Sequence, residues 1–419
     1  MDKKILIIGN SVKAYALAKY LSKICTVYVA PGTDTIKEFA ECIDIRENAV
    51  PELLEFAMET GIDMTIPVSA LTLSTDIVKK FADNNLQIFA PLKEAHKIVN
   101  DKTLAKKILY KLRIPTPKFG IFEKQAMALD YIKNLDKPFV IKTNEPSSAV
   151  VLSSNTPAKN IVECMFAKQQ QRVLIEDYVC GTPFSFYAIT DGYKALPFGT
   201  SLLYKHSLEG DGGQLTSGMG ACSPNNKLTI ENEKYLLEKV IYPTLEFLER
   251  EGNPYIGILG VNGILTDNNV IQILGYQSFM QDSDCQAILD CLDTELYNLM
   301  SSCIIGSFSD EIDIVEQKDI NAISLVIQCK NKDNSENTIY GLDEIDDELT
   351  VNYFPSVKKN KYCEYEATNG AVLVLTTNAK TVNSAVNKIY SEASRLNFKG
   401  ISYRKDICKP IDKSFFADC

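Results

Sequence analysis

A glycine-rich segment in the middle of the chain has the composition of a loop that contacts a ligand. Residues 209–224 read EGDGGQLTSGMGACSP, with five glycines in eleven positions. Glycine backbone approaches a ligand closely and directs several N–H groups toward it. A long hairpin connection without a ligand has the same composition, but a loop this long and glycine-rich in a compact domain is more often functional.

A second candidate site is the turn Gly9-Asn10-Ser11-Val12-Lys13-Ala14, which follows an apolar run and precedes a helical pattern. Backbone N–H groups at the start of such a helix can hold an anion. The turn has one glycine, whereas a dinucleotide fingerprint needs three. A nicotinamide dehydrogenase is therefore poorly supported, and a plain strand-to-helix turn is the alternative.

Residue types that are rare or absent exclude several kinds of site. His96 and His206 are the only histidines, so a metal centre built from several histidines is excluded. The twelve cysteines are scattered without a CxxC motif, which excludes the usual zinc and thioredoxin spacings. We expect reduced thiols in a cytoplasmic protein, with the cysteines acting as small core residues.

Charge and length narrow the class of protein further. The 419 residues carry a formal net charge of −10, which argues against a general nucleic-acid binder. The start lacks a signal peptide, and no run of about 18 apolar residues predicts a membrane span. We therefore expect a cytoplasmic protein that binds neither nucleic acid nor membrane.

The order of predicted elements divides the chain into three parts. Alternating buried strands and helices over the first ~100 residues predict a doubly wound α/β domain, with strands near 4–8, 26–30, 63–67 and 86–90 and helices near 51–60 and 73–84. Strand patterns near 139–142, 173–178, 184–190 and 195–200 predict a middle α+β part with helices near 231–251. Strands near 322–328 and 371–376 and a helix near 382–396 predict a C-terminal α+β part.

Eight short motifs, taken in order, resemble the phosphoribosylamine-glycine ligases, ATP-grasp enzymes of purine synthesis also called glycinamide ribonucleotide synthetases. Each motif alone is weak, but the ordered set runs over nearly the whole chain. The motifs are Ile8-Gly9-Asn10, Ala30-Pro31-Gly32, Ile88–Pro91, Arg113–Thr116, Pro138–Lys142, Thr216–Pro224, Thr368-Asn369-Gly370 and Arg404–Ile407.

The resemblance implies a fold and a reaction. We expect an N-terminal α/β domain at 1–101, an ATP-grasp domain at 102–308 with a lid at about 118–185, and a C-terminal α+β domain at 309–419. The reaction joins the amine of phosphoribosylamine to the carboxylate of glycine. ATP is hydrolysed to ADP and phosphate, with an acyl phosphate intermediate and Mg²⁺ offsetting phosphate charge.

The resemblance also assigns residues to roles. Lys142 and Asp211 are the predicted catalytic residues. ATP binding falls on Lys102, Lys142, Glu176, Asp177 and Val179, and metal binding on Asp282 and Asp284, for which a solvated surface turn is the alternative. Substrate binding falls on Gly9, Asn10, Gly213, Thr216, Gly218, Met219, Arg404 and Lys405, where a solvated turn is again the alternative for the last two.

Several positions depart from the family pattern. The Gly-Lys-Gly lid motif corresponds to Ala149-Val150-Val151, and the Glu-Phe-Asn that supplies metal ligands corresponds to Gly275-Tyr276-Gln277. The ribose-contacting acids of the hinge fall on Thr182-Pro183. Two hypotheses follow: an ATP-dependent ligase acting on glycine and phosphoribosylamine, as a monomer or weak homodimer, or a catalytically impaired or redirected paralogue that binds a nucleotide or serves as a scaffold.

Overall fold

The N-terminal part of the chain forms a four-stranded parallel sheet. The computed structural model describes residues 3–144, 149–152, 155–167, 172–306, 308, 312–330 and 337–409. The strand order is β3-β2-β1-β4, with β1 at Lys4–Gly9, β2 at Thr26–Pro31, β3 at Glu41–Cys42 and β4 at Met64–Pro67. β1 and β4 are almost wholly buried, as parallel strands covered on both faces must be. The predicted α/β arrangement is confirmed.

Helices surround this sheet, and one of them differs from the prediction. They are α1 (Val12–Leu21), the short turn η1 (Ile36–Glu38), α2 (Val50–Thr60), α3 (Ala70–Leu73), α4 (Ile77–Asp83) and α5 (Lys93–Asn100). The helix expected near 73–84 begins only at Ile77, because the Ser74 and Thr75 hydroxyls donate to the carbonyls of Ala70 and Thr72 in competition with helical bonds. The strand expected near 86–90 is reduced to one bridge between Thr65 and Ile88.

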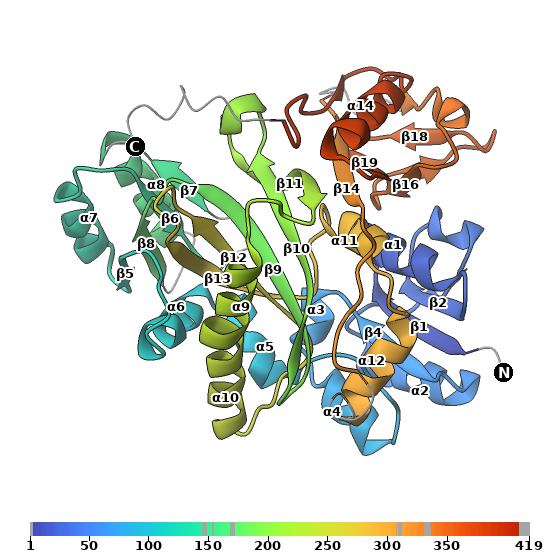
Figure 1. The fold of residues 1–419 in the computed structure, drawn as a ribbon, viewed down its shortest axis with the longest axis horizontal. Helices are drawn as coiled ribbons and strands as arrows, with labels where there is room; N and C mark the ends of the chain where they lie inside the picture. The colour runs from blue at the N-terminus through green and yellow to red at the C-terminus, as the bar shows by residue number, and fades with distance from the viewer. Residues whose placement is uncertain are drawn as a thin grey trace.

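The region predicted as a lid contains a separate small antiparallel sheet. Its strand order is β5-β8-β6-β7, with β5 at Phe119–Phe122, β6 at Phe139–Lys142, β7 at Val150–Leu152 and β8 at Val173–Asp177. Helices α7 (Gln125–Lys133) and α8 (Asn155–Ala167) pack with it around their own apolar core. In Figure 1 this unit forms the teal lobe, reached through α6 (Lys102–Lys111).

A nine-stranded antiparallel sheet runs through the middle of the molecule. Its main path is β13-β12-β9-β10-β11-β14-β19-β16, and β20 also pairs with β14. The strands are β9 (Thr182–Asp191), β10 (Ala195–His206), β11 (Leu215–Ser223), β12 (Ile256–Leu265), β13 (Ile271–Ser278), β14 (Asn321–Cys329), β16 (Thr350–Tyr353), β19 (Gly370–Ala379) and β20 (Ile401–Ser402). Because β11 pairs with β14, the sheet continues across the expected boundary between residues 308 and 309.

The remaining elements cover this sheet and complete the C-terminal unit, drawn orange to red in Figure 1. They are η2 (Glu209–Asp211), α9 (Ile230–Leu236), η3 (Leu237–Ile241), α10 (Tyr242–Arg250), α11 (Cys285–Cys291), α12 (Leu296–Ile305), β15 (Asn337–Thr338), η4 (Leu342–Glu344), β17 (Lys358–Lys359), β18 (Tyr365–Ala367) and α14 (Val382–Ala393). Strands β15, β18 and β17 form a third small antiparallel sheet. Among the described residues, no helix has both the length and the apolar character of a membrane span.

The cysteines depart in part from the expected pattern of reduced core residues. Several free cysteines are buried, including Cys285 and Cys303, whereas Cys363 is exposed. The Cys222 and Cys408 side chains lie against each other as a candidate disulfide pair, unlike the free cysteines. The fold brings their Cα atoms to 6.2 Å, within the range that a disulfide spans.

Candidate active site

Two lysines converge on one buried glutamate where the small sheet meets α6. Lys142, at the end of β6, pairs with Oε1 of Glu176 on β8, and Lys106 Nζ from α6 lies 2.8 Å from Oε2. The side chains of Glu176 and Lys106 are each 1% exposed, and that of Lys142 is 15% exposed. Antiparallel pairing of β6 with β8 places Lys142 and Glu176 on adjacent strands.

The electrostatics of this lysine–glutamate cluster favour an anionic ligand. Burial raises the pKa of Glu176, but Lys142 and Lys106 outweigh burial and hold that pKa below its ordinary value. Burial lowers the pKa of Lys106 to about 8, although Glu176 opposes the shift. One carboxylate faces two ammonium groups, so the cluster carries an excess of positive charge that phosphate oxygens can neutralise.

Lys106 was missed by the sequence analysis, although its position on the helix held a signal. It falls on the same side of α6 as Ala105 and Leu109, which are buried. A lysine on the apolar face of an amphipathic helix needs a buried partner, because an isolated buried ammonium group is costly. The partner, Glu176, comes from a different element and could not be identified from helical spacing.

Lys205 is a further lysine that the sequence analysis did not select. It lies near the end of β10, immediately before the glycine-rich loop, and is half-buried. Burial, with Lys142 as a second cause, lowers its pKa to about 8. Within the described ranges its ammonium group has no hydrogen-bond or ion-pair partner. Lys205 therefore adds a third basic group to the region around Lys142.

The other predicted ATP-binding residues are Lys102, Asp177 and Val179, and each has different neighbours. Lys102 begins α6, and its backbone N–H donates to Asn144 Oδ1 at 2.9 Å, which holds the helix start next to the end of β6. The Asp177 carboxylate pairs instead with the exposed Lys137 at 2.7 Å. Val179 lies just beyond β8, in the segment that joins the small sheet to β9. The structure thus joins Lys142 to Glu176, places the backbone of Lys102 beside the end of β6, and directs the Asp177 side chain to Lys137.

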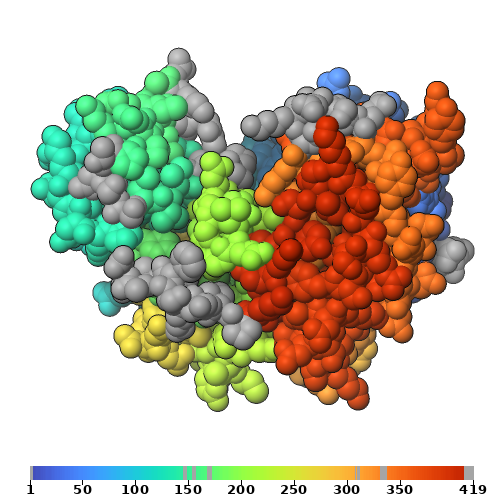
Figure 2. Space-filling view, turned by 90° about the horizontal axis from the view of Figure 1, so that it is seen from above, coloured from blue at the N-terminus to red at the C-terminus, as the bar shows by residue number. Residues whose placement is uncertain are grey.

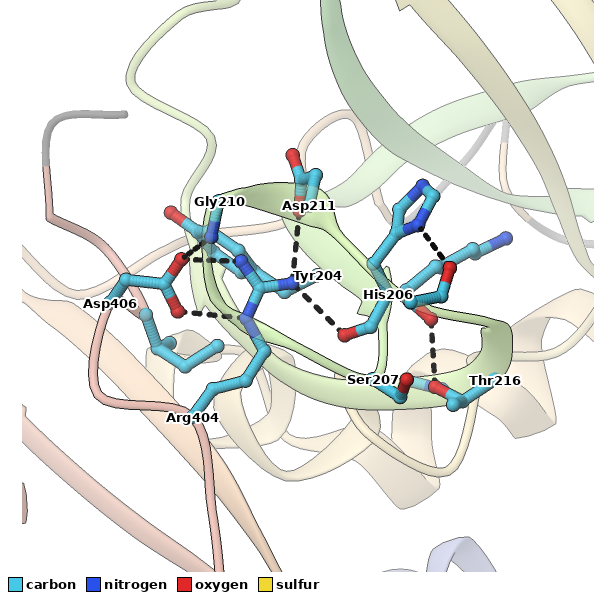
Figure 3. Close-up of polar contacts among 12 residues, drawn as sticks. Tyr204, His206, Ser207, Gly210, Asp211, Thr216, Arg404 and Asp406 are labelled. Carbon is cyan, nitrogen blue, oxygen red and sulfur yellow. Dashed lines mark hydrogen bonds and ion pairs between the residues drawn. The ribbon is translucent and has the colours of Figure 1, made fainter. Parts of the chain in front are cut away.

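The glycine-rich loop connects β10 to β11 and is held from the C-terminal unit. Arg404 Nη1 donates to Asp211 Oδ1 at 2.9 Å, and the Arg404 side chain is 1% exposed (Figure 3). Lys405 contacts the loop through its backbone N–H, which donates to Glu209 Oε1 at 3.2 Å. Direct substrate binding by Arg404 stays a prediction that this geometry does not favour, because the guanidinium already serves protein acceptors.

Three of the other predicted loop residues, Thr216, Gly218 and Met219, lie in β11. Thr216 Oγ1 donates to the Lys205 carbonyl at 2.8 Å, and Met219 is buried. Gly218 has φ +136°, and a Cβ there would lie 2.0 Å from Ser283 Oγ. Glycine at 218 therefore lets the loop approach the acidic turn that carries Asp282 and Asp284. Gly213 also has positive φ, and its carbonyl faces the ring of His206 at 3.4 Å from Nδ1.

Protein groups bond to both predicted metal ligands, fully in the case of Asp284 and through one oxygen in the case of Asp282. Asp284 Oδ2 accepts from Tyr187 at 2.8 Å and from Ser201 at 2.7 Å, and Oδ1 accepts from the backbone N–H of Gln281 at 2.8 Å. Burial raises the pKa of Asp284, against the effect of these bonds. Asp282 Oδ1 accepts from the Lys13 backbone N–H at 3.3 Å.

These surroundings do not fit a magnesium site that needs both Asp282 and Asp284, because Asp284 is fully engaged. A carboxylate that already accepts three hydrogen bonds in a buried position has little capacity left for a cation. In β13, where the family carries metal ligands, the Tyr276 hydroxyl is bonded to Thr244 at 2.9 Å. The part of the chain that the structure describes holds no group of three or more His, Cys, Asp or Glu residues suited to a metal ion.

Asp282 instead connects the acidic turn to the turn of residues 9–14, which the sequence predicts as an anion site. Gly9 ends β1, Asn10 follows it, and the Ser11 side chain caps α1 by accepting from the Ala14 N–H at 3.5 Å. The Asp282 carboxylate at the Lys13 N–H therefore takes a position near the helix start that an anionic ligand would otherwise use. The structure brings Gly9, Asn10 and Asp282 into one region.

The Asp284→Asn variant tests whether this carboxylate is structural. We expect the free energy of unfolding to fall by about 1–3 kcal/mol, because one buried acceptor is replaced by a donor facing Tyr187 and Ser201. The affinity for Mg²⁺ in the presence of ATP should stay unchanged, measured by calorimetry beside the exposed control Asp293→Asn. A lost Mg²⁺ response at unchanged stability would restore Asp284 as a metal ligand.

Two models of one protein family match most of this chain. The model of the phosphoribosylglycinamide synthetase N domain matches residues 3–98, and that of its ATP-grasp (A) domain matches residues 100–285. The chain belongs to the phosphoribosylglycinamide synthetase family. Both models end before the C-terminal unit, so Arg404 and Lys405 lie outside the matched ranges.

Curated relatives extend the phosphoribosylglycinamide synthetase likeness to nearly the full chain. A phosphoribosylamine–glycine ligase of Clostridium acetobutylicum is 30% identical, with 97% of this chain and 99% of the relative covered. One from Caldanaerobacter subterraneus subsp. tengcongensis is 29% identical, with 96% and 99% covered. The C-terminal unit is therefore part of the same family likeness.

Solved structures show the same fold. The crystal structure of a phosphoribosylamine–glycine ligase from Thermotoga maritima has a TM-score of 0.80 at 21% identity, covering 97% of this chain and all of that one. The biotin carboxylase domain of the Hydrogenobacter thermophilus 2-oxoglutarate carboxylase has a TM-score of 0.72 at 14% identity, covering 96% and 92%. The fold of this chain is thus that of the phosphoribosylglycinamide synthetases, with the expected ATP-grasp domain.

Proposed function

We propose that this chain is an ATP-dependent carbon–nitrogen ligase that forms an amide between glycine and 5-phosphoribosylamine. The observation that carries the proposal is the lysine–glutamate cluster, where Lys106 and Lys142 pair with the single carboxylate of Glu176 and Lys205 lies near enough to Lys142 to feel its charge. Its excess positive charge suits the phosphates of ATP. Family membership and the names of the full-length relatives supply the substrates.

The reaction needs charge stabilisation during phosphoryl transfer and a loop that holds the reactants in place, and the described residues can supply both. Lys142 and Lys205 offset charge on the transferring phosphoryl group as the glycine carboxylate becomes an acyl phosphate. The amine of phosphoribosylamine then attacks the acyl carbon and releases phosphate. Backbone N–H groups of the glycine-rich loop hold the reactants near the cluster. No step is assigned to Mg²⁺, since Asp282 and Asp284 do not fit it.

A coupled assay of ADP release tests the proposal. The full chain is incubated with ATP, Mg²⁺, glycine and freshly made phosphoribosylamine, and each substrate is omitted in turn. We expect ADP release that requires both glycine and the amine and that is lost in Lys142→Ala. Release at the level of Lys142→Ala, or release independent of glycine, would contradict it.

One observation favours a second candidate function, a nucleotide-binding or scaffold protein with impaired or redirected chemistry. It is the engagement of all the Asp284 oxygens by Tyr187, Ser201 and Gln281. Calorimetry with ATP, with and without Mg²⁺, separates the two. Mg²⁺-independent binding without turnover supports the scaffold, and Mg²⁺-dependent binding with turnover supports the ligase. A cytoplasmic location and a monomeric or weakly dimeric state stay predictions.

The dependence of kcat/KM on pH should follow the protonation of Lys205. Burial and Lys142 lower its pKa to about 8, so its ammonium form is lost as the pH rises through that value. We expect kcat/KM for ATP to fall above pH 8 and Lys205→Arg to move that fall to higher pH, because the guanidinium keeps its proton. The profile of Lys133→Arg, at an exposed lysine of α7, serves as control. A wild-type profile without this fall would show that the charge of Lys205 is not needed.

A further inference from the structure

The segment of residues 404–408, here called the C-terminal strap, is fastened to the base of the glycine-rich loop. Its centre is Arg404, whose guanidinium donates from Nε to Asp406 Oδ1 at 2.8 Å and from Nη2 to Asp406 Oδ2 at 2.6 Å. Nη1 donates to Asp211 Oδ1 at 2.9 Å and to the His206 carbonyl at 3.0 Å. Figure 3 shows the guanidinium between Asp406 on one side and Asp211 and His206 on the other.

Further contacts tie the strap to the same loop. Asp406 Oδ2 accepts from the Gly210 N–H at 2.9 Å, and the Cys408 N–H donates to the Tyr204 hydroxyl at 2.9 Å. The Arg404 guanidinium lies over the Tyr204 ring, 5.1 Å from its centroid. In Figure 2 the yellow-green loop region and the red C-terminal unit lie against each other. The loop is thus held at both Gly210 and Asp211 from residues almost two hundred positions away.

The loop needs such support because its backbone is strained. Asp211 has φ +53°, between Gly210 at +63° and Gly213 at +78°. A residue with a side chain costs of order 1–2 kcal/mol in the left-handed region, and such residues persist where their surroundings hold them. The ion pair from Asp211 to Arg404 is the contact that holds this one. Without it, the loop is free to relax to other conformations.

The held conformation leaves part of Asp211 available. Its Oδ1 is used by Arg404, while Oδ2 has no hydrogen-bond partner among the described residues, and the side chain is 16% exposed. Asp211 also lies near enough to Tyr178, which follows β8, to raise the pKa of that hydroxyl together with burial.

We propose that Arg404 is a positioning residue, which holds the glycine-rich loop through Asp211 in the conformation that receives the amine and amino-acid substrates. It makes no contact with those substrates, because four of its five donors serve Asp211, Asp406 and the His206 carbonyl and its side chain is only 1% exposed. The role rests on the proposed ligase function. The C-terminal unit, which lies outside the matched family models, thereby controls substrate binding while ATP binding depends on Lys142 and its neighbours.

Kinetics and hydrogen exchange of the full chain test this role with Arg404→Lys, which keeps the charge and loses the two-pronged geometry. We expect the KM for glycine or phosphoribosylamine to rise about tenfold or more, as the loss of charged hydrogen bonds implies, with the KM for ATP unchanged. The backbone amide of Gly210 should exchange faster. Arg395→Lys, at an exposed arginine of the same unit, is the control and should match the wild type.

A purely structural role predicts a different result. Lower stability with unchanged KM values and unchanged exchange at Gly210 would overturn the proposal. If Arg404→Lys fails to fold because Asp406 loses its two-pronged partner, the double variant Arg404→Gln with Asp406→Asn removes both charges and takes the same measurements. If the wild type shows no ligase turnover, the ligase proposal fails, and exchange at Gly210 and Gln214 alone decides whether Arg404 holds the loop.

Discussion

The Glu176→Gln variant is expected to lower the free energy of unfolding by about 3–5 kcal/mol, the cost of removing one partner from a buried ion pair. The amide leaves Lys106, with a side chain only 1% exposed, and Lys142 without a carboxylate. Urea denaturation at neutral pH measures the loss. Glu238→Gln is the matched control, since its exposed pair with Lys234 contributes about 0–1 kcal/mol.

The stabilising contribution of Glu176 should also depend on pH in a predictable direction. The pKa of Glu176 in the folded protein lies below its ordinary value, because Lys142 and Lys106 outweigh burial. Its stabilising contribution is therefore complete above the pKa of an unfolded glutamate and is lost as the pH falls through the lowered pKa. The stability of Glu176→Gln should approach that of the wild type in acid. A loss no larger than that of Glu238→Gln at neutral pH would refute the buried charge cluster.

The second large effect is expected on catalysis. Lys142→Met should reduce the rate of ADP release about 10²–10³-fold, the usual cost of removing one group that stabilises charge in a transition state. Stability should change less than in Glu176→Gln, because Glu176 keeps its ion pair with Lys106. Steady-state kinetics and thermal melts on the same samples separate the two effects.

Two further variants serve as comparisons for Lys142→Met. Lys142→Arg keeps the charge but presents a planar fork, so partial activity is expected. Lys133→Met, at an exposed lysine near the end of α7, should match the wild type. Turnover by Lys142→Met within a few-fold of the wild type would remove Lys142 from the ATP phosphates and leave Lys106 and Lys205 as the basic groups of the site.

Local pattern was sufficient for much of the architecture. β1, β2 and β4 are short apolar runs with turn residues after them, and α2 has the expected helical spacing, so periodicity alone predicted them. It failed between 70 and 90, where Ser74 and Thr75 bond to the preceding carbonyls and the helix predicted from residue 73 begins only at Ile77. It also could not show that β11 pairs with β14, because that pairing joins strands about a hundred residues apart.

By itself the sequence determined the alternation of strands and helices, the glycine-rich loop and a lysine at the end of β6, since each depends on neighbours along the chain. The tertiary structure alone decided what those groups contact. Lys142 shares Glu176 with Lys106, Asp284 turns toward Tyr187 and Ser201, and Arg404 meets Asp211 across 193 positions. A buried charge must find its partner wherever the fold places one, and that placement depends on which distant elements pack together.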